Sequence, residues 1–217
     1  MKSAVPAARL IDNPARILEA ATDAFAASGF HGTPMREIAR RAGVSQALLH
    51  HHYGTKEALW HAVGERVSAE FLAYVADVLA SPPAASDTVP TAIRTYMRYW
   101  KEHPSAFRLN LWRLLEGPTA ERSARSLALN KRAVPMIRNA QAAGLVRDDM
   151  PAGLALIIAG SLVQFWLHSQ IEIRDALAVT GDPVPDDEAF ADIVHRLIRT
   201  SNEPAKKKRR AARDAAR

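Results

Sequence analysis

Apolar residues recur along most of this chain at intervals of three and four, which is the period of an amphipathic helix. Glycine, proline and helix-capping residues separate these stretches. We expect Pro135 to kink or split one of the helices. The pattern predicts an all-α fold of about nine helices, with approximate ranges 14–29, 34–42, 46–52, 56–80, 90–102, 104–116, 119–143, 151–178 and 186–200.

Residues 33–56 carry the most distinctive pattern, two short helices joined by a tight glycine turn. We expect Thr33 to cap the first helix with its hydroxyl and Gly43 to end that helix in the left-handed conformation. Val44 then fills the angle between the helices, and Ser45 caps the second one. Two helices in this order are typical of a helix-turn-helix, whose second helix enters a DNA groove.

Composition is that of an ordinary globular protein, with 217 residues of which 48% are hydrophobic and 24% are charged. The chain has no cysteine, which excludes disulfides, thiolate metal sites and a cysteine nucleophile. The longest apolar run, residues 154–167, is short and contains Ser161 and Gln164, and residues 1–9 lack a signal-peptide core. We therefore expect a cytoplasmic protein with no membrane partner.

The net charge of +6 is concentrated at the end of the chain, because residues 204–217 alone carry +6. We expect this basic tail to be flexible, and it either adds a nonspecific grip on DNA or only aids solubility. The rest of the chain is neutral, so the local charge is more informative than the total. Segment 31–56 has an excess of basic residues, with Arg36, Arg40, Arg41 and Lys56 against Glu37.

The motifs of residues 14–62 resemble those of the TetR family of bacterial transcriptional regulators. The matching residues are Ala24-Phe25, Gly29-Phe30, Thr33, Ile38-Ala39, Ala42-Gly43-Val44-Ser45, Leu49, Tyr53 and Lys56-Glu57-Ala58-Leu59. Beyond residue 62 only the number, lengths and order of the helices match. The resemblance implies a DNA-binding domain at 1–55, a connecting helix at 56–80 within a ligand-binding and dimerisation domain at 56–203, and the tail 204–217.

The resemblance also implies which residues contact DNA. These are Thr33, Arg36, Ser45, Gln46, Ala47, Leu48, His50, His51 and Lys56. Gln46 suits an adenine edge and Leu48 a thymine methyl, while hydroxyls and a lysine suit phosphates. The family usually has a tyrosine at the position of His50, so we expect this contact to depend on pH near neutrality. Successive helical positions project about 100° apart, so His50–His52 are not expected to bind a metal.

The helices after residue 90 carry apolar stripes that suit either a core or an effector pocket. The candidate pocket residues are Trp100, Phe107, Asn110, Leu111 and Phe165. Four arginines in this part are expected to be solvated rather than bound to an anionic ligand: Arg94, Arg98, Arg108 and Arg113.

Helix 151–178 has two apolar faces and so needs two partners. One partner is the body of the same chain. The simplest second partner is another copy of the chain, with the last helix at the same seam. The candidate dimer residues are Gly153, Ala159, Gly160, Phe190, Ile193, Val194 and Leu197.

These features together favour a homodimeric repressor that binds a palindromic double-stranded DNA operator and is released by a small-molecule effector, with the signal passing along helix 56–80. An architectural DNA-binding protein without a ligand is the alternative. An enzyme is disfavoured because the chain has no phosphate-binding glycine loop, no HExxH, no cysteine and no serine in a nucleophile elbow. No cofactor is expected.

Overall fold

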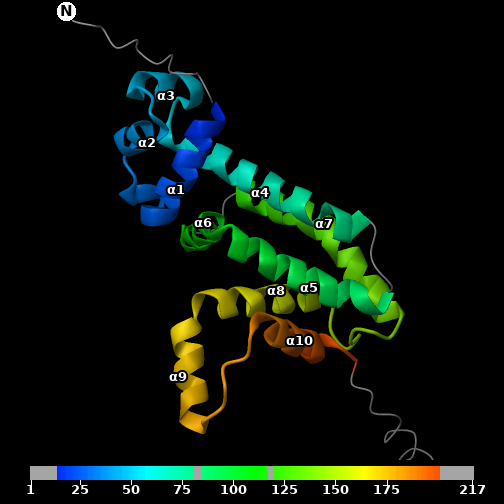
Figure 1. Cartoon of the computed structure of the whole chain (residues 1–217). Helices are drawn as coiled ribbons and strands as arrows, with labels where there is room; N and C mark the ends of the chain where they lie inside the picture. The colour runs from blue at the N-terminus through cyan, green and yellow to red at the C-terminus, as the bar shows by residue number, and fades with distance from the viewer. Residues whose placement is uncertain (1–13, 81–84, 117–119, 201–217) are drawn as a thin grey trace, which may run out of the picture. The chain divides into compact units, whose positions relative to one another are not determined.

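The computed structural model of this chain describes residues 14–80, 85–116 and 120–200 (Figure 1). The tail 204–217 and residues 1–9 lie outside this part. The predicted all-α fold is confirmed. Ten helices are found in the described residues: α1 Pro14–Gly32, α2 Met35–Ala42, α3 Gln46–Tyr53, α4 Lys56–Ala80, α5 Ala85–Glu102, α6 Pro104–Leu115, α7 Ala120–Ala142, α8 Ala152–His168, α9 Gln170–Thr180 and α10 Asp187–Ile198.

The chain divides into two compact units, which are described separately. The first unit comprises residues 1–81 and 95–131, and therefore α1–α4, the later part of α5, α6 and the first half of α7. The second comprises residues 82–94 and 132–217, and therefore the rest of α5 and α7 with α8, α9 and α10. The predicted DNA-binding head is thus part of a larger unit, and its boundary at residue 55 stays a prediction.

The core of the first unit forms where α1 packs on the start of α4. Phe25 of α1 is fully buried, and its ring meets the Trp60 ring of α4 edge to face with 4.9 Å between centroids. Thr55 caps α4, since the Ala58 N–H donates to its hydroxyl oxygen at 3.1 Å. The apolar side of α4 that faces this core carries the buried residues Leu59, Val63, Val67, Phe71 and Val75.

The core of the second unit lies between α8 and α10. Trp166 of α8 is buried, stacks on Phe190 of α10 with 4.2 Å between ring centroids, and donates its indole N–H to the Asp187 carboxylate at 2.9 Å. Asp186 caps α10 by accepting from the Ala189 N–H at 2.8 Å. These contacts close the chain back on α8 after the loop that precedes α10.

Two prolines lie inside helices that they were expected to start or interrupt. α5 begins at Ala85 rather than Pro90, and α7 runs without a break through Pro135. Ala133 and Ile137 on either side of Pro135 are both buried. The prediction of a split is therefore wrong, and the alternative of a kink at Pro135 stays a prediction.

Residues 151–178, predicted as one helix, form two helices that meet at 87°. The bend is at Ser169, whose φ of −110° and ψ of 37° are not helical. Ser169 is buried, and its hydroxyl lies 2.7 Å from Nδ1 of His168. This break raises the number of helices from nine to ten. No single helix among the described residues is long and apolar enough to cross a membrane, although the bent pair α8 and α9 together reaches that length and composition.

Candidate nucleic-acid interface

The turn between α2 and α3 has the predicted helix-turn-helix geometry. Gly43 has a φ of 65° and a ψ of 33°, a left-handed conformation that glycine adopts without steric cost. The Val44 N–H donates to the Ala39 carbonyl at 3.0 Å, which closes the end of α2. Ser45 then caps α3 by accepting from the Leu48 N–H at 3.0 Å. The roles predicted for Gly43 and Ser45 at the helix ends are confirmed.

Thr33 has a different role from the predicted one. Only 2% of this residue is exposed, and its hydroxyl lies 2.7 Å from the Gly29 carbonyl oxygen and 3.1 Å from that of Ala24. The capping position of α2 is Pro34, which has no side-chain cap. The hydroxyl thus donates its proton to a backbone carbonyl of α1, and Gly29 is the nearer acceptor. Both the prediction that it caps α2 and the prediction that it contacts phosphate are wrong for this arrangement.

α3 is anchored by one residue and presents the others to solvent. Leu49 is fully buried, and Leu48 is half-buried. The four residues of α3 that are exposed are Gln46, Ala47, His50 and His51. All four were predicted to face DNA. The structure brings them together on one open surface of a short helix, and their contact with bases stays a prediction.

The two side chains at the centre of this surface, Gln46 and His50, are held in position by short-range contacts. Nδ1 of His50 lies 2.7 Å from the Gly54 carbonyl oxygen, which can only accept, so this nitrogen carries the proton. In the neutral ring Nε2 of His50 is then an acceptor, and it lies 3.5 Å from the side-chain amide nitrogen Nε2 of Gln46. One imidazole therefore links the α3 side chains to the turn that leads into α4.

The basic residues of the helix-turn-helix differ in how available they are to contact DNA. Glu37 accepts from Nε of Arg40 at 2.8 Å and from Nε of Arg41 at 2.7 Å. These hydrogen bonds, Arg40 first, lower the pKa of Glu37 from 4.5 to about 2. Because the folded pKa lies below the ordinary value, the carboxylate stabilises the fold above about pH 4.5, and this contribution disappears as the pH falls through about 2.

Lys56 and Arg36 complete the basic set. Nζ of Lys56 lies 4.7 Å from the centroid of the Phe30 ring and 3.4 Å from the His31 carbonyl oxygen, so this lysine is already engaged within the head. Arg36 is exposed and has no ion-pair partner among the described residues. Of the four basic residues predicted to form the patch, Arg36 is the most available for a DNA phosphate.

α6 packs on the end of α1 through Trp112. The indole N–H of Trp112 and Nε of Arg108 both donate to the Ala26 carbonyl at 3.1 Å. Gly29 breaks the helical conformation of α1 with a φ of 68°. A Cβ at Gly29 would lie 2.9 Å from the Trp112 ring, closer than real side chains approach. Glycine is therefore required here both by the backbone conformation and by the ring.

The neighbouring Arg113 links α6 to α4. It is buried, donates from Nη1 to the Trp60 carbonyl at 2.9 Å, and places its guanidinium carbon 4.8 Å from the centroid of the Trp60 ring. The expectation that Arg113 is solvated is wrong. Trp112 was not predicted to have a role, because the sequence of an amphipathic helix does not show which neighbouring helix a tryptophan or an arginine contacts.

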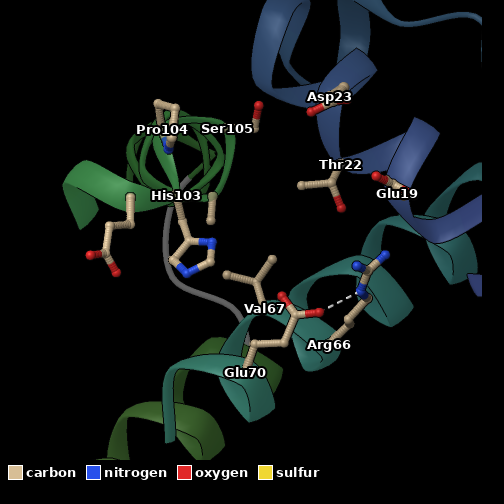
Figure 2. A pocket seen from close by; sticks show the side chains of 11 residues that line it. Glu19, Thr22, Asp23, Arg66, Val67, Glu70, His103, Pro104 and Ser105 are labelled. Atoms are coloured by element: carbon tan, nitrogen blue, oxygen red, sulfur yellow. Dashed lines mark hydrogen bonds and ion pairs between the residues drawn. The ribbon is translucent and has the colours of Figure 1, made fainter. Parts of the chain in front are cut away.

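A cleft of about 220 Å³ lies in the first unit between α1, α4 and the junction of α5 with α6 (Figure 2). Four of its lining side chains are carboxylates, from Glu19, Asp23, Glu70 and Glu102. Figure 2 shows the ion pair between Arg66 and Glu70, whose Nε and Oε1 are 2.7 Å apart. The acidic lining does not suit a phosphate, and none of the five predicted effector residues lines this cleft.

The predicted effector residues belong to both units. Trp100 and Phe107 are buried in the first unit with 5.8 Å between ring centroids, and Phe71 stacks on Trp100 at 5.6 Å. Asn110 and Leu111 are half-buried on α6. Phe165 belongs to the second unit and is 49% exposed on α8, so its assignment to an enclosed pocket is corrected. The indole nitrogen of Trp100 is buried and lacks a hydrogen-bond partner among the described residues.

The predicted dimer residues also need correction, because the small-residue side of α8 faces its own protomer. Ala159 and Val194 are buried there and are not available to a second copy. Gly153, Gly160, Phe190 and Ile193 are half-buried, and Phe190 already stacks on Trp166. Leu197 is exposed as expected. The open apolar surface of α8 is its opposite side, which carries Leu154, Ile157 and Phe165.

Comparisons with known proteins support the helix-turn-helix and the helical body independently. Residues 17–63 match the family model of bacterial regulatory proteins of the tetR family, and residues 89–196 match that of the tetracyclin repressor-like C-terminal domain. The chain is 31% identical to the HTH-type transcriptional repressor SCO4008 of Streptomyces coelicolor, over 79% of this chain and 86% of the relative. It is 29% identical to the repressor NicS of Pseudomonas putida, over 81% and 84% of the two chains.

The fold also matches solved structures. The crystal structure of AibR in complex with isovaleryl coenzyme A and operator DNA superposes with a TM-score of 0.66 at 19% identity, over 84% of this chain and 95% of AibR. At this identity the likeness concerns the fold. Together with the two family matches and the relatives above, it leads to one conclusion: the chain belongs to the TetR family of bacterial transcriptional regulators.

Proposed function

We propose that this regulator is a homodimeric repressor that binds a two-fold symmetric operator through α3 and is released by a small-molecule effector. The observation that carries the proposal is the exposed face of α3, on which Gln46, Ala47, His50 and His51 are all open to a major groove. Two relatives that match most of the chain, SCO4008 and NicS, are named as repressors, which supports repression rather than activation.

Dimerisation is supported by the apolar side of α8 that the protomer leaves open. Leu154, Ile157 and Phe165 are each about half exposed there, with Leu197 exposed on α10. α8 contains no Asp, Glu, Lys or Arg. A two-fold axis brings such a face against itself and removes it from water. Two heads held in this way would meet successive major grooves about 34 Å apart.

Effector binding is supported by the aromatic cluster around Trp100. The buried indole N–H of Trp100 lacks an acceptor, and leaving such a donor unpaired is unfavourable, so an effector with an acceptor atom would gain a hydrogen bond there. The effector must bind one arrangement of the heads better than the other, because equal affinity for both shifts nothing. AibR shows that this fold accommodates an acyl coenzyme A and operator DNA in one complex.

The contacts of α6 offer a route for this response. The same helix carries Phe107 beside Trp100, and Trp112 and Arg113 against the head. A shift of α6 would therefore reach α1 through the Ala26 carbonyl and α4 through Trp60. This adds a second path to the one predicted along α4.

Selection from a random pool of DNA duplexes tests the proposal. The full chain is expected to enrich an inverted repeat whose half-site centres lie about 10 base pairs, or a multiple of this, apart. The enriched duplex then serves as the probe in fluorescence anisotropy, with candidate effectors added. Failure to enrich any sequence, or enrichment of an isolated half-site only, would contradict the proposal.

Arg36→Ala is expected to weaken binding to the selected duplex about fivefold and to reduce the slope of log affinity against log salt by about 1, because one phosphate contact is lost. The measurement is anisotropy over a range of salt concentrations. Arg138→Ala is the matched control, since Arg138 is an exposed arginine on α7 in the second unit. Equal salt slopes for the two variants would remove Arg36 from the interface.

A further inference from the structure

α9 differs from the other helices because it buries none of its eleven residues. It leaves α8 at an angle of 87°. Figure 1 shows the change of direction between the two helices. The apolar residues Ile171 and Val179 are 65% and 87% exposed. A helix of this length is marginal in water without tertiary contacts. We therefore expect α9 to contact a partner in addition to its own protomer.

The two sides of α9 have different surroundings. Gln170, Ile173 and Leu177 share one side of the helix and are half-buried, so this side contacts the rest of the protomer. Ile171, Ala178 and Val179 lie on the opposite half and are exposed. α9 is thus attached along one stripe and presents outward a second stripe, in which the apolar Ile171 and Val179 lie on either side of Asp175.

The charges of α9 indicate what kind of partner fits this outer stripe. Glu172, Arg174 and Asp175 give the helix a net charge of −1. Nucleic acid and anionic membranes attract basic helices, so neither suits this surface. An apolar stripe with a few charges of both signs is typical of contact with another protein.

The position of α9 points to a second copy of this chain. Exposed apolar residues occur on both sides of the bend at Ser169, Phe165 just before it and Ile171 just after it. A partner molecule that covers the open face of α8 would therefore also lie beside α9. In the proposed dimer that partner is the other protomer.

We propose that α9 is an arm that packs its Ile171, Ala178 and Val179 stripe on the second copy and so stabilises the dimer beyond the α8 face. This inference rests on the proposed dimer. The two-fold symmetry supplies one such contact for each arm, so both arms are covered in the same assembly.

Val179→Asp tests the contribution of the arm to dimer stability. We expect the dimer dissociation constant, measured by sedimentation velocity over a dilution series, to rise at least about tenfold, because a charge would be placed in an apolar contact. Val184→Asp is the matched control, since it makes the same change at an exposed valine in the loop after α9. Circular dichroism is expected to be unchanged in both variants, because neither valine is buried in the protomer.

A label on the arm tests what covers it. The chain has no cysteine, so Val179→Cys carries a single environment-sensitive fluorophore, and Asn139→Cys on the exposed side of α7 serves as the reference. Iodide quenching of the label at position 179 is expected to be weak when the protein is dimeric and to rise with dissociation on dilution. The label at position 139 is expected to be quenched equally at all concentrations.

The outcomes separate this inference from the proposed dimer. A stable dimer in which the label at position 179 is freely quenched would contradict the proposed packing of α9 and leave the proposed dimer intact. An unchanged dissociation constant in Val179→Asp would do the same. Protection that does not change on dilution would show that the chain covers its own arm, which also overturns the inference. A protein that is monomeric at all concentrations would overturn the proposed dimer together with the arm.

Discussion

Ile157→Asp is expected to turn the dimer into monomers and to lower operator affinity about a hundredfold or more, since two linked heads gain affinity that a single head lacks. Ile157 is 52% exposed on the open face of α8, where the protomer offers it no cover. A carboxylate at this position would be buried without a partner if the dimer formed, which is strongly unfavourable. Sedimentation velocity and anisotropy with the selected duplex measure the two effects.

Leu127→Asp is the matched control for this variant. Leu127 is 54% exposed on α7 of the first unit, so the same charge is added at an apolar residue of similar exposure. This variant is expected to remain dimeric and to bind the duplex with wild-type affinity. If Ile157→Asp also stayed dimeric with full affinity, the open face of α8 would not be the dimer interface.

Gly29→Ala is expected to lower the free energy of unfolding by about 3 kcal/mol, because its φ of 68° and ψ of −178° lie in a region that essentially only glycine occupies and the added Cβ crowds a well-packed ring. The added Cβ would meet the Trp112 ring at 2.9 Å, and the indole is held by its hydrogen bond to Ala26. Urea denaturation followed by circular dichroism measures the change. The variant is also expected to weaken operator binding, because α6 would no longer seat on α1.

Gly181→Ala gives the cost of a positive φ without crowding. Gly181 has a φ of 73° and a ψ of 17°, a left-handed conformation that is less strained for alanine than that of Gly29, and a Cβ there would meet nothing within 4 Å. Gly181→Ala is expected to lower the free energy of unfolding by about 1 kcal/mol, from the backbone conformation alone. In a double variant, Trp112→Leu removes the ring and should make the further loss from Gly29→Ala smaller. Equal losses in Gly29→Ala and Gly181→Ala would mean that the Trp112 contact does not constrain α1.

Some features of the site were predictable from short stretches of sequence. The end of α2 at Gly43, the cap of α3 at Ser45 and the cap of α4 at Thr55 each depend on a backbone conformation or a hydrogen bond within a few residues. The exposed face of α3 was predicted from the family resemblance instead, and of the two leucines on this helix the head buries only Leu49 completely.

Other features depended on partners far along the chain. α8 has apolar or small residues all round, so its sequence offers two equivalent faces, and only its packing against α10 left Leu154 and Ile157 open. The bend at Ser169 has no glycine or proline to mark it. Thr33 differs from these cases, because the predicted cap of α2 and the observed hydrogen bond to Gly29 are both local and use the same hydroxyl, and the sequence did not show which of them forms.

The amino-acid order alone was therefore enough to predict an all-α regulator with a helix-turn-helix, since helix periodicity, caps and the glycine turn all arise between near neighbours in the chain. Only the folded molecule decided that Trp112 and Arg113 hold the head and that α9 stands apart from its own core. Those choices depend on which surfaces compete to bury the same apolar side chains, and that competition is between segments separated by many residues.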